Sequence, residues 1–329
     1  MDNGTKLPRR ALAAATLTAT SLFAAGRARA ETWPDRPVRL MVGFPPGGST
    51  DIVARLVGLG LSAAWGQPVV IENRGGANAT IATDAVARAA PDGYTLLFAA
   101  NNLVMNPPLF ARLPYDIERD LAPIHCVGLS PNVLTCGSMQ PWRSLAELVA
   151  AAKAQPGRIG YSSSGMGSNG HYALVLLGRA AGIDLAHYPY RGAAPATQDT
   201  IAGTVPLTMN PIASLIGAIR ADQLRPLAVT GARRAAELPD TPTFAEAGFD
   251  LPDTGTWYGV LAPSATPPAL VGRLSDDIGR LLRQPEFVTR LTTQGAAPFG
   301  LDAAAFKARI HADLAQWRQV AEAAGIRPE

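Results

Sequence analysis

One stretch near the start of the chain, Val38–Arg55, constrains the fold more than any other. The run Val38–Val42 is short, apolar and partly β-branched, which is typical of a buried strand. The segment Phe44-Pro-Pro-Gly-Gly48 ends that strand, because proline lacks an N–H group and glycine permits positive φ. Ser49–Asp51 then has the residue types that begin a helix. We therefore predict a strand, a tight loop and a helix in direct succession.

A unit of this kind directs free backbone N–H groups, at the positive end of a helix dipole, toward one point. That point suits an anion, although Gly-rich turns between strand and helix also occur without ligands. A second unit of the same type follows, with a predicted strand at Arg158–Ser162, a loop at Ser163–Gly170 and a helix from His171. Both loops would lie at the carboxyl ends of strands, where α/β sheets bind ligands. If the two loops face each other, their helix N-termini converge on one cleft.

The first thirty residues have the composition of a secretory signal. Lys6, Arg9 and Arg10 precede the apolar stretch Ala11–Ala25, and Ala28-Arg-Ala30 matches a cleavage site, so we expect the mature chain to start near Glu31. The apolar stretch is shorter than the roughly 20 residues that a membrane span needs. The Arg9-Arg10 pair leaves both the Sec and the twin-arginine route open. We therefore expect a periplasmic protein.

The charge of the chain argues against a nucleic-acid partner. The predicted signal carries 5 of the 29 basic residues and 1 of the 26 acidic ones, so the remaining 299 residues have a net charge of −1. A nucleic-acid interface needs a basic patch, and no cluster of Lys or Arg remains after the signal.

The length and the order of elements predict two α/β lobes. A chain of 299 residues exceeds the size at which one core keeps growing, about 250–300 residues. Predicted strands and helices alternate, which indicates mostly parallel sheets flanked by helices. Ser130-Pro131 interrupts a long extended run, and we expect a crossing between lobes there. We expect Trp257–Leu261 to be a strand that returns to the first lobe.

Other kinds of chemistry have weaker support. Gly165-x-Gly167-x-x-Gly170 matches the dinucleotide fingerprint, but Asp184 precedes the next strand, whereas the ribose-binding acid should follow it. An exported NAD(P) oxidoreductase that uses this loop stays as the alternative function. The Ser162–Ser164 hydroxyls and His171 lack both the nucleophile-elbow motif and an acidic partner.

Cysteine and histidine give no metal site. The four histidines (125, 171, 187 and 311) do not occur at ligand spacing with cysteine or carboxylate residues, so we expect no metal and no cofactor. Cys126 and Cys136 leave two alternatives open in an exported protein, namely a disulfide or two buried thiols.

Several motifs, in this order, resemble the Bug/TctC family of extracytoplasmic solute-binding proteins of tripartite tricarboxylate transporters. The resemblance covers the whole predicted mature chain and rests on Phe44-Pro-Pro-Gly-Gly-Ser-Thr-Asp51-Ile-Val-Ala-Arg55, Glu72-Asn-Arg74, Pro91-Asp-Gly-Tyr94, Ser163-Ser-Gly165, Pro189-Tyr-Arg-Gly-Ala-Ala-Pro-Ala196, Leu224–Thr230 and Leu238-Pro-Asp-x-Pro-Thr243.

The resemblance implies a type II periplasmic binding protein that closes on a small organic carboxylate and delivers it to a membrane permease. Lobe 1 would comprise residues 31–129 and 253–329, and lobe 2 would comprise residues 130–252. Such a protein is expected to be a monomer and not an enzyme. A ligand sensor that feeds a two-component kinase is the second alternative, and the sequence does not separate it from transport.

The resemblance also implies the ligand-binding residues. In the family, main-chain N–H groups and bridging waters hold the carboxylate between the two loops, and Phe44 and Trp257 would be apolar walls of the cleft. The expected residues are Phe44, Pro45, Gly47, Gly48, Ser49, Thr50, Asn101, Asn102, Ser163, Ser164, Gly165, Ser168, Arg191, Gly192, Asn210 and Trp257.

Two positions depart from the family pattern. Asn210 replaces an Asp that faces the cleft in some members, so we expect a carboxylate without an amine, such as a dicarboxylate, hydroxy acid or aromatic acid. The segment Gly75–Ala79 lacks the usual Pro-Gly-Ala-Gly-Gly, so the shape of that wall is open. Asp51 would repel a bound anion, and we expect its side chain to turn back and cap its own loop.

Overall fold

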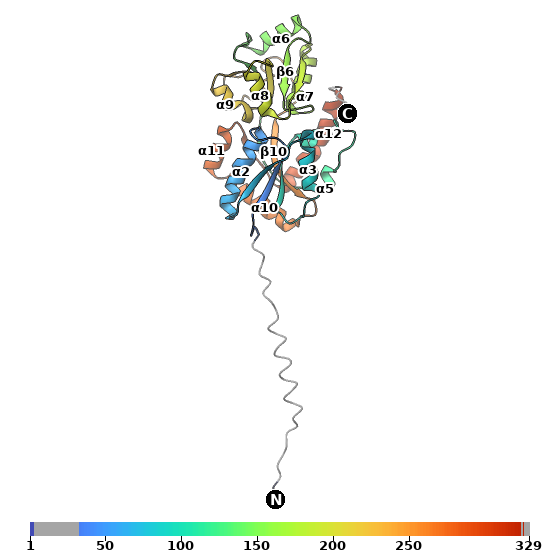
Figure 1. Ribbon diagram of the computed structural model, residues 1–329, viewed down its shortest axis with the longest axis vertical. Coiled ribbons are helices and arrows are strands. Elements are labelled where there is room, and N and C mark those ends of the chain that lie inside the picture. The colour runs from blue at the N-terminus through green and yellow to red at the C-terminus, as the bar shows by residue number, and fades with distance from the viewer. Residues whose placement is uncertain (3–32, 324, 326–329) are drawn as a thin grey trace. The chain divides into compact units, whose positions relative to one another are not determined.

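The computed structural model of this 329-residue chain describes residues 1–2, 33–323 and 325 (Figure 1). Nearly all of the predicted signal peptide, residues 1–30, lies outside the described residues. The chain divides into a unit Met1–Arg36 and a unit Pro37–Glu329, and the described helices and strands belong to the second. Within that part, no helix is long and apolar enough to span a membrane.

Two sheets organise the second unit, and each is the centre of one lobe. Lobe 1 contains a six-stranded sheet in the order β11-β4-β10-β3-β1-β2. Its strands are β1 (Val38–Val42), β2 (Val69–Asn73), β3 (Thr95–Ala100), β4 (Leu121–Ser130), β10 (Thr256–Pro263) and β11 (Ala297–Leu301). Its helices are α2 (Ser49–Trp65), η1 (Ala77–Ala79), α3 (Thr80–Ala87), α4 (Asn102–Met105), α5 (Ile117–Asp120), α10 (Pro268–Leu282), α11 (Pro285–Thr293) and α12 (Ala303–Ala323).

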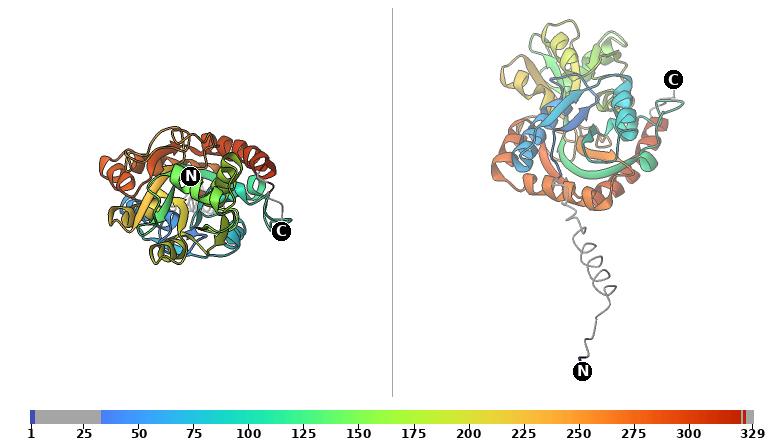
Figure 2. Two further views of the ribbon diagram at one scale, coloured as in Figure 1. Left: turned by 90° about the horizontal axis from the view of Figure 1, so that it is seen from above. Right: turned by 60° about the horizontal axis from the view of Figure 1, so that its bottom comes forward.

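Lobe 2 contains a five-stranded sheet in the order β7-β6-β8-β5-β9. Its strands are β5 (Asn132–Gly137), β6 (Gly160–Ser163), β7 (Ala186–Pro189), β8 (Leu207–Pro211) and β9 (Leu224–Val229). Its helices are α6 (Leu145–Ala154), α7 (Asn169–Ala181), α8 (Ala193–Ile201) and α9 (Ile212–Arg220). Helices surround each sheet, as Figures 1 and 2 show. The α/β two-lobed fold is therefore the one that the sequence predicts.

The sheets are mixed, whereas we expected mostly parallel ones. In lobe 1, β1 is parallel to β2 and β3, but β10 is antiparallel to β3 and β4, and β11 to β4. In lobe 2, β6 is parallel to β7 and β8, but β5 is antiparallel to β8 and β9. The chain leaves the first sheet along β4 and returns along β10, so these neighbours must run in opposite directions.

The crossing between the lobes falls where the sequence places it. β4 ends at Ser130 and β5 begins at Asn132, so Pro131 alone separates strands of two different sheets. Proline lacks the N–H that would continue the ladder. The return strand β10 belongs to the six-stranded sheet, as predicted from Trp257–Leu261. The proposed boundaries at residues 129/130 and 252/253 stay a prediction.

The last helix packs on the six-stranded sheet through one of its faces. Phe306, Ile310 and Trp317 of α12 are buried against the six-stranded sheet. Trp317 also meets Tyr172 of α7 edge to face, with ring centroids 5.2 Å apart, so an aromatic contact joins the two lobes. Cys126 and Cys136 are both buried and free, so the alternative with two buried thiols holds.

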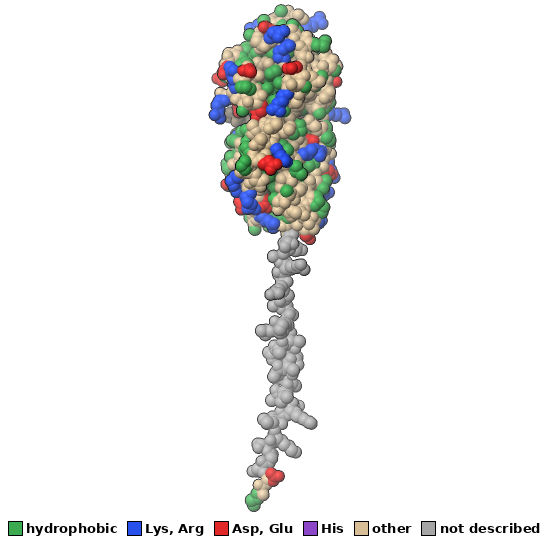
Figure 3. Space-filling model, turned by 90° about the vertical axis from the view of Figure 1, so that its left-hand side faces the viewer, with side chains coloured by type: hydrophobic (Ala, Val, Ile, Leu, Met, Phe, Trp, Pro, Cys, Tyr) green, Lys and Arg blue, Asp and Glu red, His purple; other side chains and the backbone are tan. Residues whose placement is uncertain are grey.

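Charged side chains are dispersed over the surface that Figure 3 presents. Basic and acidic residues alternate there, without a continuous basic area. This face therefore offers no patch of the type that binds nucleic acid.

Candidate functional site

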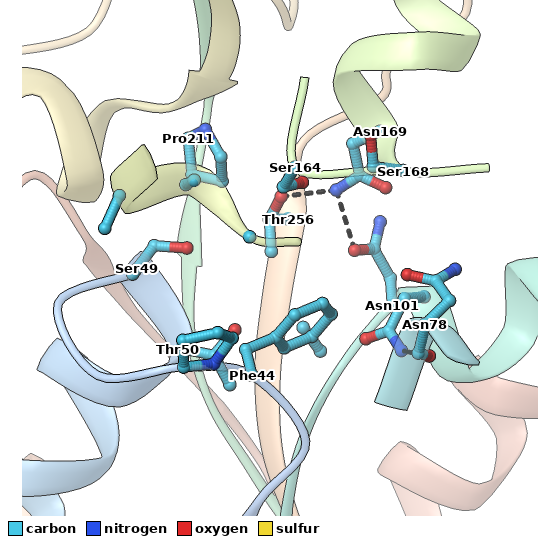
Figure 4. Close-up of a pocket in the computed structure, with 17 residues that line it drawn as sticks. Phe44, Ser49, Thr50, Asn78, Asn101, Ser164, Ser168, Asn169, Pro211 and Thr256 are labelled. Carbon is cyan, nitrogen blue, oxygen red and sulfur yellow. Dashed lines mark hydrogen bonds between the residues drawn. The ribbon is translucent and has the colours of Figure 1, made fainter. Parts of the chain in front are cut away.

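A cavity lies between the lobes, and its walls come from both of them (Figure 4). This inner cavity has a volume of about 40 Å³. It is lined by Phe44, Pro45, Gly48, Ser49, Thr50, Asn78, Ala100, Asn101, Asn102, Ser164, Ser168, Asn169, Gly192, Ala193, Ala194, Pro211 and Thr256. An outer cavity of about 830 Å³ shares five of these residues, namely Phe44, Pro45, Asn78, Ser164 and Gly192. The two cavities are therefore adjacent.

Besides Asn101 of the four-residue α4, the N-cap residues of four longer helices line the inner cavity. They are Gly48 of α2, Ser168 of α7, Gly192 of α8 and Pro211 of α9. The first N–H groups of a helix have no acceptor within it, and its N-terminus carries roughly half a positive charge. The sequence predicts the convergence of α2 and α7. The structure adds the N-terminus of α8. It also brings the N-terminus of α9 there, but the N–H groups of Ile212 and Ala213 already donate to the Pro131 carbonyl at 2.9 Å and the Ser130 hydroxyl at 3.2 Å.

Asp51 shapes the first loop from within, as expected. Its Oδ2 accepts the Gly47 N–H at 3.0 Å, and both carboxylate oxygens accept bonds of 2.9 Å from Arg55. Asn73 donates to Asp51 Oδ1 and to the Phe44 carbonyl, each at 2.9 Å. Burial alone would raise the pKa of Asp51, but the bonds from Arg55, Gly47 and Asn73 outweigh it and hold the pKa below its usual value. The carboxylate is thus neutralised inside the loop.

Most of the residues expected at the site line one of the two cavities. The inner cavity contains Phe44, Pro45, Gly48, Ser49, Thr50, Asn101, Asn102, Ser164, Ser168 and Gly192, and the outer cavity adds Gly165 and Arg191. Gly47 and Ser163 differ from these: Gly47 is exposed and turns its N–H to Asp51, and Ser163 is fully buried. Neither of them is a lining residue.

Trp257 and Asn210 are not lining residues either, because both are buried behind the cavity wall. Successive side chains of a strand point to opposite faces, so Thr256 faces the cavity while Trp257 points into the core. The indole N–H of Trp257 donates to Asp313 at 2.9 Å. Asn210 is buried in β8 and donates to the Thr208 hydroxyl at 2.8 Å, and its neighbour Pro211 reaches the cavity instead.

Sequence reasoning missed several lining residues. Asn169 and Ala193 belong to first turns of helices, so the rule that points to Ser49 would have found them. Leu109, Phe110 and Tyr190 carry no such local signal, and only the packing of the lobes brings them to the outer cavity.

The wall whose shape the sequence left open is an unusual turn. Ala77, Asn78 and Ala79 all have positive φ, between 45° and 70°. The Asn78 side chain donates to Asn106 Oδ1 at 2.7 Å, and Asn102 donates to the Asn78 carbonyl at 2.8 Å. These amide bonds from α4 and the residue after it hold the turn in place.

Arg191 is the one Lys, Arg, Asp or Glu residue among those that line the two cavities, within the part of the chain that the structure describes. It is exposed and follows β7. The two cavities therefore combine neutral donors in the inner one with a single cation in the outer one.

Nothing in the described residues supports a metal or a dinucleotide here. They contain no group of three His, Cys, Asp or Glu side chains that could hold a metal ion. Packing explains why position 170 of the fingerprint is a glycine, because a Cβ there would lie 1.9 Å from the Met209 carbonyl oxygen.

Comparison with known proteins agrees with this geometry. Residues 53–326 match the model of the TctC family, described as the tripartite tricarboxylate transporter family receptor. The chain belongs to this family. It is a TctC-family periplasmic solute-binding protein, and the family consists of receptors rather than enzymes, so the oxidoreductase alternative is wrong.

Individual relatives cover nearly the whole chain. Protein BugT of Bordetella pertussis is 34% identical over 300 residues, which are 91% of this chain and 92% of BugT. The structure of Rpa4515 of R. palustris with adipate has a TM-score of 0.88 and 34% identity, covering 90% of this chain and 100% of that one. The structure of MatC of Rhodopseudomonas palustris with bound malate has a TM-score of 0.80 and 29% identity. The match covers 88% of this chain and 99% of MatC.

Proposed function

We propose that this TctC-family protein binds a small dicarboxylate between its lobes and delivers it to the membrane subunits of a tripartite tricarboxylate transporter. The observation that carries the proposal is the convergence of four helix N-termini on a cavity without an acidic side chain among its lining residues. The adipate and malate held by two related structures are both dicarboxylates.

The inner cavity is the proposed site of the first carboxylate. Each charge-assisted hydrogen bond contributes about 1.5–3 kcal/mol net. Three to five such bonds, less the cost of ordering ligand and loops, correspond to roughly micromolar affinity, or about −8 kcal/mol. No lysine is needed, since the N–H groups of the first turns supply the donors.

The outer cavity is the proposed site of the rest of the ligand. Phe44, Leu109, Phe110 and Met166 give it apolar walls that suit a methylene chain. Arg191 has the charge to pair with a second carboxylate. A dicarboxylate therefore satisfies both cavities, whereas a monocarboxylate leaves Arg191 without a counter-charge.

The experiment compares two ligands of equal length. Isothermal titration calorimetry with adipate and hexanoate separates the second carboxylate from the chain, and Arg191→Gln removes its proposed partner. We expect adipate to lose about tenfold in affinity, which is about 1.4 kcal/mol, while hexanoate is unchanged. Arg158→Gln, at another exposed arginine of lobe 2, is the matched control.

Two results would overturn the proposal. One is an unchanged ratio of adipate to hexanoate affinity in Arg191→Gln. The other is the absence of any thermal stabilisation by a panel of dicarboxylates, because a ligand at 100 times its Kd should stabilise the protein by about 2.7 kcal/mol.

Export and delivery need cellular tests. Mass spectrometry of the periplasmic protein checks whether it starts near Glu31. The double substitution Arg9→Lys and Arg10→Lys distinguishes the export routes, because it blocks export only on the twin-arginine route. For delivery, we expect uptake of labelled ligand to require both this protein and the permease. A transcriptional response that persists without the permease would favour a sensor instead.

A further inference from the structure

Two histidines of lobe 2 stack behind the second binding loop, Ser163–Ser168. His171 lies in the first turn of α7, and His187 lies in β7. Their ring centroids are 4.3 Å apart with 10° between the planes. Tyr161 of β6 stacks on His187 at 4.7 Å. His171 is 8% exposed and borders the outer cavity.

Each ring holds one glycine of this loop. The Gly167 N–H donates to His171 Nδ1 at 3.0 Å. The Gly165 N–H donates to Ser163 Oγ at 3.2 Å, and that oxygen lies 2.7 Å from His187 Nε2. Gly165 and Gly167 have φ of 140° and 69°, in a region that only glycine adopts freely. Glycine adopts negative φ just as readily, so its backbone preference alone does not hold the two residues in this conformation. These contacts hold the loop together with two backbone bonds, from Ser168 N–H to the Gly165 carbonyl at 3.1 Å and from Gly192 N–H to the Ser164 carbonyl at 3.0 Å.

The two rings respond differently to a proton. His171 Nδ1 accepts a hydrogen bond, so its proton must reside on Nε2 and the ring must be neutral. A protonated His171 would instead direct an N–H at the Gly167 N–H and break the contact. His187 is different, since a protonated Nε2 can still donate to the Ser163 hydroxyl oxygen.

We infer that His171 is the positioning residue of the second binding loop. Its neutral ring holds the Gly167 N–H so that Ser164 and Ser168 line the inner cavity, and a proton on Nδ1 releases the loop together with its ligand. The consequence for the ligand rests on the proposed carboxylate function. The contact between His171 and Gly167 does not.

The surroundings keep the ring neutral at ordinary pH. The titratable or charged groups around it are His187, Tyr172 of its own helix, and Tyr190 and Arg191 across the outer cavity. Among the described residues, no carboxylate forms a hydrogen bond or an ion pair with the ring. Burial lowers the pKa of His171 to about 4, and burial together with the neighbouring His171 lowers the pKa of His187 to about 3.

The first test needs no ligand. Long-range ¹H–¹⁵N NMR of the wild-type protein reports the tautomer and the titration of each imidazole. We expect His171 to carry its proton on Nε2 and to stay neutral from pH 8 down to about pH 5. A proton on Nδ1 at neutral pH, or titration near the ordinary histidine value, would overturn the inference.

The second test uses two variants and adipate as the probe. His171→Asn places an amide oxygen near the position of Nδ1 and cannot be protonated, whereas His171→Phe keeps the stacked ring but removes the acceptor. We expect His171→Asn to bind adipate within about threefold of wild type, and His171→Phe to lose about tenfold at every pH, as one lost hydrogen bond predicts. His311→Asn, at a histidine whose side chain is 77% exposed, is the control.

The pH profile separates positioning from mere packing. Adipate itself takes up protons near pH 4–5, but this affects every variant equally. We expect wild type to lose affinity more steeply than His171→Asn below about pH 5, with circular dichroism confirming that both stay folded. Equal profiles, or full affinity in His171→Phe, would contradict the inference. If no carboxylate binds at all, the proposed function fails while the NMR test still decides the role of His171.

Discussion

The side-chain nitrogen of Asn169 donates a hydrogen bond of 2.8 Å to the side-chain oxygen of Asn101 (Figure 4). Asn169 begins α7 in lobe 2, whereas Asn101 follows β3 in lobe 1. The same nitrogen reaches the hydroxyl of Thr256 at the start of the crossing strand β10. Asn101 in turn donates to the Gly255 carbonyl at 2.9 Å. One buried amide therefore connects both lobes and a crossing strand beside the cavity.

The first prediction concerns this link between the lobes. Asn169→Ala removes the inter-lobe bond, so we expect the population of the open form to rise. Adipate affinity should then fall about five- to tenfold, as for the loss of a hydrogen bond of about 1 kcal/mol. Small-angle scattering of the ligand-free variant should show a more expanded particle than wild type. Asn102→Ala is the control for the scattering, because Asn102 lines the same cavity but donates within lobe 1. Identical scattering and unchanged affinity in Asn169→Ala would contradict the role of the link.

The second prediction concerns Asp51. Asp51→Asn weakens the bonds to Gly47 and Arg55, so we expect a loss of about 2–3 kcal/mol in the free energy of unfolding, measured in urea. The pKa of Asp51 is lowered in the folded state, so its contribution is present above the unfolded pKa and is lost as pH falls through the folded one. A variant that kept full stability and lost only affinity would show that Asp51 touches the ligand.

A matched substitution separates a buried carboxylate from a surface ion pair. Asp84→Asn breaks the pair with Arg88, which has the same spacing of four residues and side chains that are 29% and 68% exposed. Exposed pairs contribute about 0–1 kcal/mol, so this control should unfold close to wild type.

The sequence predicts much of this fold because its signals are local. The apolar run Val38–Val42 coincides with β1, and α2 begins at Ser49, where the N-cap residue types begin. Strand direction has no such local signal, since an apolar run looks the same in either direction. β11 escaped prediction because it contains Pro298 and Gly300, which are unfavourable in most strands and tolerated at an edge.

The residues of the candidate site are likewise predictable from the sequence only where their signal is local. Loops before helices are readable, and most of the Phe44–Thr50 segment lines the inner cavity. Trp257 points away from the cavity because a shift of one residue moves a strand side chain to the opposite face. The stack of His171 on His187 depends on α7 packing beside β7, and no periodicity in the sequence encodes that meeting.

The third prediction is the exclusion of amino acids. Asn210 does not explain it, because Asn210 lies behind the cavity. The reason is instead the absence of Asp and Glu among the described lining residues of both cavities, so an ammonium group would be buried without a counter-charge. We expect calorimetry to show malate binding at least about tenfold more tightly than aspartate, which differs in having an amine for the hydroxyl. Aspartate or glutamate binding as tightly as malate would contradict this.

The last prediction is the dependence of stability on pH that His171 should confer. Its pKa is about 4 when folded, against 6.5 as the unperturbed value, because burial disfavours the charged ring. Between these values the unfolded chain binds the extra proton, so stability is complete above pH 6.5 and is lost as pH falls toward 4. The loss from this ring is about 3 kcal/mol at roughly 1.4 kcal/mol per pH unit. Urea unfolding of wild type and His171→Asn at several pH values measures it, and the variant should show the shallower dependence. His311→Asn should match wild type, because that side chain is 77% exposed. Equal slopes for wild type and His171→Asn would mean that the His171 ring does not stay neutral in the folded protein.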